Sequence, residues 1–547
     1  MHGRPVPQAL GHPQDSHPQR WRILGVLVLA LLVTSIDHTI INVALPQLVG
    51  DLGASAADLQ WVVAGYTVVF AGLLLTAGSL GDRFGRRRAL LIGLATFLAG
   101  SIAAALATST STLILARCVM GAGGALIMPT TLSILVNAFG EPRERAKAIA
   151  AWTAVSGAGI AVGPIVGGAL MRSFSWSAVF WINVPLLLAA LVGALHVVPD
   201  SRDPQATRLD PIGATLSVLA ISSLVYAIIQ GPEQGWLSTR TVTTFAIGAV
   251  TTALFLAWET VRDDPMLDLR LFRHRGFSVA SVALAMLFFA MAGAVFLQAQ
   301  YLQFILDYTP LAAGFALVPA AIGIMMGTGA GAHLGAVAGS RVTVATGTLV
   351  AAAGLATQAA FVDGTSYAPT GIGLLLFGFG AGIAMPAATD LIMATLPPAR
   401  AGVGSAVNDT VRELGGVLGV AVIGSIAATT YTATLRPDLG HFPELTDPMR
   451  AVITDNVGAA IGMSHHVGAN GAEIASLART AFVDSMSGAL WIAAAAAVIA
   501  TVLAVVYLPR EAHRGDGGDG GHGTAPSDAT AEGHAHHSRR SSVHAHR

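Results

Sequence analysis

Apolar residues occur in long blocks along most of the chain, and polar residues are confined to short segments between them. Runs such as 23–34, 90–106 and 491–508 approach the roughly 20 residues with which an α-helix crosses a bilayer core. The pattern predicts an all-α integral membrane protein. We predict about fourteen spans, near 23–45, 60–80, 89–108, 112–136, 147–170, 178–198, 211–230, 240–260, 277–304, 312–333, 342–361, 370–395, 402–428 and 485–508.

Composition favours the same class of protein. Of the 547 residues, 53% are hydrophobic and only 11% are charged, which lies outside the usual range of soluble globular proteins. The single cysteine, Cys118, excludes an intramolecular disulfide and a thiolate metal cluster. The formal net charge is -1, and the chain has no basic domain on which a nucleic-acid-binding role could rest.

Arginine placement predicts the orientation in the membrane, because short cytoplasmic loops hold most basic residues. Loops on the opposite side, such as 47–59 and 361–369, hold almost none, so both termini are predicted to be cytoplasmic. The long segment 431–484 is an exception that contains three arginines, but long loops translocate largely regardless of charge. The loops assigned to the cytoplasm carry Arg83, Arg86, Arg87 and Arg88; Arg143, Arg145 and Lys147; Arg202 and Arg208; Arg262, Arg270, Arg273 and Arg275; Arg341; and Arg400.

The stretch LTAGSLGDRFGRRRALL, in the turn between the second and third spans, concentrates charge in an apolar region. Its arginines fix topology, but topology requires neither an acid nor the flanking glycines. The segment GSLGDRFGRRRAL resembles the loop signature of the major facilitator superfamily, and it matches Gly78, Leu80, Asp82, Arg83, Gly85, Arg86 and Arg87 in order. The resemblance implies a cytoplasmic gate in which Asp82 and the arginines join the two halves of the protein. Ion pairs at a wet interface are worth about 0–1 kcal/mol, so they can exchange during a cycle.

A second signature, GIAVGPIVGG, lies in the fifth span. Gly159, Gly163 and Gly167 recur every four residues, which predicts a stripe where another helix approaches closely. Pro164 predicts a bend. Such stripes usually mark ordinary helix packing, but the full pattern through Gly168 resembles the antiporter signature of the same superfamily and implies export.

Further matches extend the resemblance over nearly the whole chain, from DHTIINVALP in the first span through WINVP to GSAVNDTVRELGGVLGVAVIGS in the thirteenth. Two extra spans between six-helix halves resemble the arrangement of the fourteen-span drug:proton antiporter family of multidrug efflux proteins. The fourth-span pattern Arg-x-x-Gln-Gly departs from that family, because it retains Arg117 and Gly121 but has Met120 in place of glutamine. The second half retains only Gly339 and Arg341 of the gate signature.

The resemblance implies a major facilitator fold with two six-helix halves and two additional helices between them. The tail is rich in Gly, Ser and His, so we expect solvated disorder, with metal buffering by its histidines as the alternative. The expected parts are a cytoplasmic N-terminal tail (1–22), the first half (23–198), a cytoplasmic linker (199–210), the inserted helices (211–260), a second cytoplasmic linker (261–276), the second half (277–508) with a long extracytoplasmic loop (431–484), and the His-rich cytoplasmic tail (509–547).

Asp37 is the clearest candidate for function, because an ionisable group at bilayer depth costs about 2.5–3.5 kcal/mol. On a helix, Thr34, Asp37, His38 and Asn42 fall within a sector of about 140°, which predicts a polar face toward a central cavity. In the functional interpretation the carboxylate binds either a proton or a cationic substrate, and the two compete for one charge. The alternative is that Asp37 and His38 pair with each other or with a neighbouring helix.

Four further residues complete the candidate cavity. Glu413 in the thirteenth span is either a cavity acid or a structural partner of Arg412, and Asp390 in the twelfth is either exposed to the cavity or buried and hydrogen-bonded. The resemblance implies proton coupling for Arg117, although a long side chain can also snorkel to the outer face. Tyr66 can contact a delocalised cation through its ring.

The drive for transport must be an ion gradient, because the chain has no Gly-x-x-x-x-Gly-Lys-Ser/Thr signature. We expect a secondary transporter without enzymatic activity, cofactor or metal, working as a monomer in a bacterial inner membrane. It would export lipophilic cations and other amphipathic drugs in exchange for protons by alternating access. Export of one endogenous metabolite, antibiotic or lipid is the nearest alternative, and a membrane sensor that works through 431–484 or the tail is the other.

Overall fold

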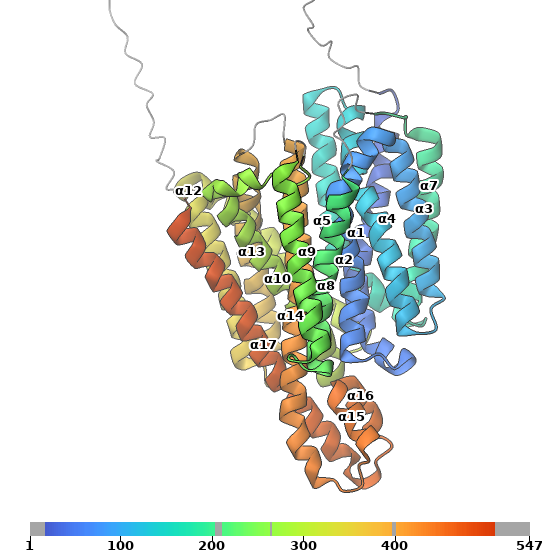
Figure 1. The fold of residues 1–547 in the computed structure, drawn as a ribbon, viewed down its shortest axis with the longest axis vertical. Helices are drawn as coiled ribbons and strands as arrows, with labels where there is room; N and C mark the ends of the chain where they lie inside the picture. Colours follow the sequence, from blue (N-terminus) through green and yellow to red (C-terminus); the bar gives the residue numbers. More distant parts are fainter. Residues whose placement is uncertain (1–16, 203–209, 263–264, 396–400, 509–547) are drawn as a thin grey trace, which may run out of the picture. The chain divides into compact units, whose positions relative to one another are not determined.

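The computed structural model describes residues 17–202, 210–262, 265–395 and 401–508, and these residues form helices without any strand (Figure 1). The predicted His-rich tail lies outside the described residues, as does most of the first linker. The first part of the chain forms α1 (Arg20–Leu52), α2 (Ala56–Phe84), α3 (Arg86–Ala105), α4 (Thr110–Ala138), α5 (Pro142–Met171), α6 (Ala178–Trp181) and α7 (Asn183–Val197).

A helical hairpin and a second group of helices follow. The hairpin consists of α8 (Pro211–Gln234) and α9 (Thr239–Val261). The second group consists of η1 (Leu269–Arg273), α10 (Arg275–Gln300), the π-helical turn η2 (Tyr301–Ile305), α11 (Pro310–Ala316), α12 (Val318–Phe361), α13 (Ala368–Ala394), α14 (Ala401–Asp438), η4 (Leu439–His441), α15 (Asp447–Asp455), α16 (Val457–Ser464), η5 (Gly468–Asn470) and α17 (Gly471–Tyr507).

All fourteen predicted spans have helical counterparts. In the described residues, twelve helical stretches are long and apolar enough to cross a membrane, and the bent α5 raises the count to thirteen. One of the twelve, Pro310–Phe361, has 52 residues, more than twice the roughly 20 that one crossing needs. Gly339 breaks it with a φ of 79°, so its two sides match the spans predicted near 312–333 and 342–361. The chain is therefore a multi-pass membrane protein.

The predicted bend in α5 is present. The helix turns by 42° between Gly159 and Ala161. This lies just before Pro164, whose ring excludes the carbonyl four residues earlier from the helical ladder.

Two ends of the bundle serve as reference points below. We call one the Gly53 end, after the α1–α2 turn, where Gly53 adopts a φ of 63°. We call the other the Gly85 end, after the α2–α3 turn, where Gly85 adopts a φ of 111°. Successive spans run in opposite directions, so α5 starts at the Gly85 end and finishes at the Gly53 end, while α11 and the part of α12 before Gly339 run the other way.

The glycine stripe of α5 packs against α1. A Cβ atom at Gly159 would lie 2.6 Å from Ser35 Cβ, and one at Gly167 would lie 2.7 Å from Ile40 Cγ1. Gly163 lies directly against Thr39. These glycines therefore allow backbone approach within the first group of helices rather than between the two groups.

A neighbouring face of α5 contacts the second group of helices at the Gly53 end. A Cβ at Gly168 would lie 2.5 Å from Leu311 Cα, and Gly314 of α11 lies against the backbone of Pro164. Three turns earlier on the same face, Gly157 has open space around its Cβ position. In α12, the helix that follows α11, Met325 is 77% exposed. The two groups thus touch at the Gly53 end and diverge toward the Gly85 end along this seam.

The inserted hairpin packs on both groups of helices. Side chains of α2, α8 and α14 form one apolar cluster that includes Val68, Val225 and Val417. The hydroxyl of Ser217 donates to the Gly72 carbonyl of α2 at 3.1 Å. The hydroxyl of Ser425 in α14 donates to the Ile228 carbonyl at 2.8 Å. The hairpin therefore covers the seam between α2 and α14.

A polar cluster at the Gly85 end fixes the base of this hairpin. Asp210 is almost fully buried and caps α8 by accepting from the Gly213 amide at 2.9 Å. Its carboxylate also accepts from Trp258 Nε1 at 2.9 Å and lies 3.2 Å from Arg262 Nε. A buried acid with three donors is satisfied in place, so it holds α8 and α9 together.

The segment predicted as a long loop, 431–484, is mostly helical. The last turns of α14, the two short helices α15 and α16, and the first turns of α17 build it, and we call it the cap (Figure 1). Tyr431 donates from its hydroxyl to the Ile453 carbonyl at 3.0 Å, and Thr432 donates to the Thr454 carbonyl at 2.9 Å. The cap therefore has an internal structure of its own.

The contrast between Gly168 and Gly157 predicts opposite effects of one substitution. Gly168→Ala inserts a Cβ against the α11 backbone, which cannot move aside, so we expect a loss of about 1–3 kcal/mol. Gly157→Ala meets open space and gains up to about 1 kcal/mol of helix propensity. Thermal unfolding in detergent, followed by circular dichroism, measures both. An equal or higher midpoint for Gly168→Ala than for Gly157→Ala contradicts the α5–α11 contact.

Candidate functional site

A buried ion pair joins α1 to α4. Arg117 Nη1 lies 2.5 Å from Asp37 Oδ2, and both side chains are almost fully shielded from solvent. Arg117 Nε also donates to the Val62 carbonyl of α2 at 3.1 Å. The guanidinium is therefore held from two sides and does not snorkel to the outer face.

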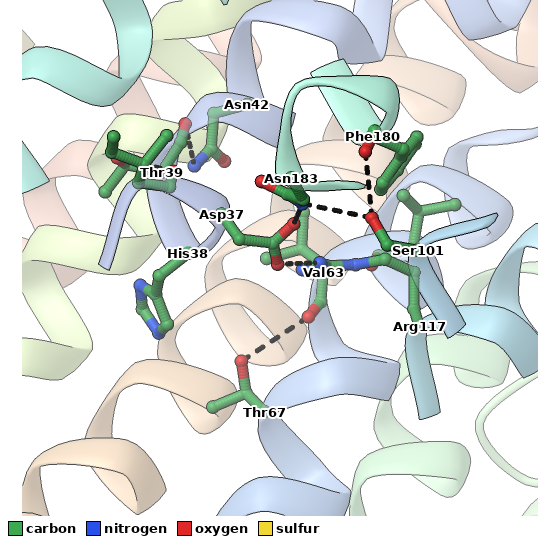
Figure 2. Close-up of polar contacts among 12 residues, drawn as sticks. Asp37, His38, Thr39, Asn42, Val63, Thr67, Ser101, Arg117, Phe180 and Asn183 are labelled. Atoms are coloured by element: carbon green, nitrogen blue, oxygen red, sulfur yellow. Dashed lines mark hydrogen bonds and ion pairs between the residues drawn. The ribbon is translucent and has the colours of Figure 1, made fainter. Parts of the chain in front are cut away.

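The second carboxylate oxygen of Asp37 has its own donor. Asn183 Nδ2 donates to Asp37 Oδ1 at 3.0 Å and lies 3.2 Å from Ser101 Oγ (Figure 2). Ser101 Oγ in turn donates to the Phe180 carbonyl at 2.9 Å. Side chains from α4 and α7 thus meet at one carboxylate of α1, and Ser101 of α3 positions the amide that α7 supplies, which satisfies a charge that would otherwise be costly to bury.

Sequence reasoning missed Asn183. The residue lies in the WINVP segment, where the available signal was a polar amide inside an apolar span.

Tyr66 packs on the guanidinium of this pair. The Arg117 guanidinium carbon lies 4.6 Å from the ring centroid, which is cation–π geometry. Gly121 lies against the Tyr66 backbone, and a Cβ at Gly124 would lie 2.7 Å from the Tyr66 hydroxyl. The ring predicted to face a substrate cation is thus occupied by Arg117. Gly121, retained from the fourth-span pattern, leaves room for α2.

His38 faces the opposite group of helices. Its Nε2 lies 3.4 Å from Glu413 Oε2 of α14, and the side chains are 42% and 20% exposed. Figure 2 shows His38 directed away from the Asp37 cluster. Glu413 does not pair with Arg412, because that arginine lies 3.6 Å from Asp409 and over the ring of Phe288.

Two other predicted residues lie outside these pairs. Asn42 is buried five residues after Asp37 on α1, and its amide donates to the Thr39 carbonyl at 3.3 Å. Asp390 is exposed and makes no hydrogen bond or ion pair within the described part of the chain. The unusual Met120 is fully buried against α3, where a Cβ at Gly100 would lie 2.7 Å from its Cγ. A glutamine at this position would therefore face α3 rather than Asp37.

The gate signature makes local contacts in this conformation. Arg86 Nε lies 2.7 Å from Asp82 Oδ1, four residues earlier in the chain. The Arg86 amide donates to the Ser201 carbonyl at 2.9 Å, and the Arg87 guanidinium donates to the Leu195 carbonyl. Arg83 is exposed, and a Cβ at Gly78 would lie 3.8 Å from Pro129. These contacts connect the α2–α3 turn to the end of α7 and the segment after it, so the joining of the two halves by Asp82 stays a prediction.

The two charge pairs differ in what can reach them. Asp37 and Arg117 are sealed from solvent, so a proton or cation reaches the carboxylate only after a neighbouring side chain moves. His38 and Glu413 are partly exposed and belong to different groups of helices, so relative movement of the groups changes their separation. Two adjacent residues of α1 therefore take part in the two pairs. Asp37 is the sealed acid, and His38 contacts the accessible acid, Glu413. No cluster of three or more metal-ligand side chains occurs in the described residues.

Comparisons with known proteins identify the family to which the chain is similar. Residues 27–420 match the family model described as Major Facilitator Superfamily. The multidrug efflux pump LfrA of Mycolicibacterium smegmatis is 35% identical over 490 residues, which cover 88% of this chain and 95% of the relative. The methyl viologen resistance protein SmvA of Salmonella typhimurium is 33% identical and is covered to 95%, with 86% of this chain matched.

A solved structure supports the fold independently. The chain is similar to a bacterial homolog of the human lysosomal transporter Spinster in an inward-facing, occupied conformation, with a TM-score of 0.62. The two are 18% identical, and the match covers 90% of this chain and 98% of that one.

The buried ion pair predicts strong coupling between its two residues. Asp37→Asn leaves a buried guanidinium without a counter-charge, and Arg117→Met leaves a buried carboxylate, so each costs about 3–5 kcal/mol. The double variant has no isolated charge. We therefore expect its loss of stability to be smaller than the sum of the two single losses by more than about 1 kcal/mol. Chemical unfolding in detergent measures this cycle. Additive losses contradict the pair.

Proposed function

Because the chain belongs to the Major Facilitator Superfamily, we propose that it is a secondary transporter that exports lipophilic, cationic drugs in exchange for protons. The names of two relatives, a multidrug efflux pump and a methyl viologen resistance protein, support export of drugs. Methyl viologen is a planar dication, so that name supports a cationic substrate class. The proposal rests on the two pairs that involve α1, Asp37 with Arg117 and His38 with Glu413, because they supply the titratable groups that such exchange needs.

Competition at carboxylates couples the two fluxes. A cationic substrate that approaches Glu413 stabilises its charged form and displaces a proton, and a proton that binds there weakens the attraction for the substrate. Movement of His38 away from Glu413 exposes the acid, and a proton that reaches Asp37 weakens its attraction to Arg117. Proton and substrate then bind in alternation rather than together.

Two acids allow two protons per cycle. Exchange of one proton for one monovalent cation moves no net charge, so only the pH difference drives it, at about 1.4 kcal/mol per unit. A second proton adds about 2.3 kcal/mol per 100 mV of membrane potential. Asp37 and Glu413 together provide the two sites that electrogenic exchange requires.

The proposed cycle alternates access between two six-helix halves, α1–α7 and α10–α17. The α5–α11 contact closes the Gly53 end, and the open space beside Gly157 lies toward the Gly85 end. The arginines of the α2–α3 turn favour a cytoplasmic position for the Gly85 end. This conformation then faces the cytoplasm, and both termini are cytoplasmic. We further propose that the protein acts as a monomer in a bacterial inner membrane.

Transport into inverted membrane vesicles tests this function. With an imposed pH gradient, we expect a fluorescent lipophilic cation to accumulate in vesicles that contain the protein and to leave when a protonophore collapses the gradient. Asp37→Asn and Glu413→Gln should each fall below about a tenth of the parent rate, because each removes a carboxylate at which proton and substrate compete. A panel of substrates distinguishes broad export from export of one metabolite.

Asp307→Asn is the matched control. Asp307 forms an exposed ion pair with Arg479 at 2.8 Å, so the same change of side chain there should leave the rate near that of the parent. Folding of each variant is checked by its elution as a single species in detergent. Accumulation that ignores the pH gradient, or full activity of both folded charge variants, refutes the proposal.

A further inference from the structure

The cap belongs to the second half by sequence, but it rests on the first half. It continues α14 and α17, and its α16 packs beside α1. At the contact, Asn456 Nδ2 donates to the Ala54 carbonyl in the α1–α2 turn at 3.3 Å. Asn456 is only 5% exposed, so this hydrogen bond is shielded from water. The cap, a segment of the second half, is therefore hydrogen-bonded to the α1–α2 turn of the first half at the Gly53 end.

Asn456 is held rigidly in the cap. Its Oδ1 caps α16 by accepting from the Ala459 amide at 2.8 Å. Its Nδ2 also donates to Asp455 Oδ2 at 2.6 Å. Because the oxygen is fixed by α16 and the nitrogen by Asp455, the amide needs no reorganisation to reach Ala54.

Asp455 contacts the same turn at a second point. Its carboxylate accepts from the backbone amide of Ala56, the first residue of α2. The first amides of a helix have no intrahelical acceptor and favour a negative partner. Two adjacent cap residues thus bind the backbone carbonyl of Ala54 within the turn and the backbone amide of Ala56 just after it.

We propose that Asp455 and Asn456 form a latch that holds the two halves together at the Gly53 end and that releases when the protein opens toward that side. The latch goes beyond the proposed export activity and rests on it only in requiring that the halves alternate. It would add to the α5–α11 contact and to the bond from Gln303 Nε2 to the Val43 carbonyl at 3.0 Å. Opening at the Gly53 end has to break all three.

The surroundings of Asp455 make the latch sensitive to pH. Groups that face it or line the adjoining cavities are Asp58 of α2, Glu233 of α8, Tyr431 of α14 and His466, which follows α16. Burial raises the pKa of Asp455 above its usual value, and the nearby charge of Asp58 acts in the same direction against the two hydrogen bonds. When the latch is open the carboxyl is hydrated, and its pKa returns toward the usual value of an aspartate.

The sign of the effect follows from this difference. A group whose pKa is higher in the docked state binds a proton on docking, so docking strengthens as the outer pH falls toward the value of the open state. Docking weakens as the pH rises through the pKa that Asp455 has in the docked state. Acid on the outer side therefore favours closure of the Gly53 end, the step that would follow proton entry from that side.

Thiol labelling tests the latch without any transport measurement. In a Cys118→Ser background, Gln300→Cys places a thiol at a 5% exposed position in the small cavity that Asp455 and Asn456 also line. A membrane-impermeant maleimide is added from the Gly53 side. Asn456→Ser keeps an oxygen to cap α16 but loses the amide donor, so we expect labelling to accelerate about three- to tenfold.

Asn470→Ser is the matched control. Asn470 is also in the cap, but its amide donates to Glu444 of the cap at 2.5 Å rather than to the α1–α2 turn. We expect its labelling rate to equal that of the parent. Unchanged labelling in Asn456→Ser, or equal acceleration in both variants, overturns the latch.

The pH dependence gives a second readout. Each labelling rate is divided by that of free cysteine at the same pH, and the outer pH is lowered from about 7 to about 4. We expect the ratio to fall on acidification in the parent and to stay constant in Asp455→Asn, which keeps an acceptor for Ala56 but does not titrate. A parent ratio that ignores pH, or a variant that follows it, contradicts the pH-sensitive latch. If vesicles show no proton-driven uptake while these differences persist, the proposed export fails and the latch stands.

Discussion

The ion pair between Asp37 and Arg117 is the constraint on which the first half of the molecule depends. Two opposite charges removed from water are tolerable only if each keeps a full set of partners, and these come from α1, α2, α4 and α7. The arrangement of those helices is thereby fixed around one carboxylate. His38, the next residue, then has only one direction left, which is toward α14. The packing that the buried ion pair requires in the first half thus places the titratable side chain of His38 against the second half.

Glycine determines which contacts are permanent and which can open. Along α5, the stripe from Gly159 to Gly167 lies against α1 and belongs to the first half. The adjacent face, with Pro164 and Gly168, meets α11 of the second half. Both contacts bring backbones close together without interlocking long side chains, which is the packing that membranes favour. Two neighbouring faces of α5 therefore differ in role: one keeps its contact with α1, and the other makes the contact with α11 that can separate.

Local signals in the sequence were enough for the spans and the motif positions, but not for the partners. Hydropathy located every span, because a bilayer requires a certain length of apolar helix. The partner of Asp37 was not predictable, because Arg117 lies 80 positions away and single-chain periodicity says nothing about distance between helices. Adjacent residues on a helix diverge by about 100°, so Asp37 could not pair with His38. The short helices of the cap, α15 and α16, escaped prediction because they have only nine and eight residues, and only a helix long enough to span a membrane has a strong apolar signature.

The hairpin inserted between the halves has a mechanical consequence. Its first helix is bonded to α2 through Ser217 near the Gly85 end and to α14 through Ile228 near the Gly53 end. A helix that is bonded to the first half near one end and to the second half near the other cannot move with both halves when they rotate apart. Any such rotation must tilt α8 or break one tie. The two additional helices therefore restrict how far, and about which axis, the bodies on either side can swing.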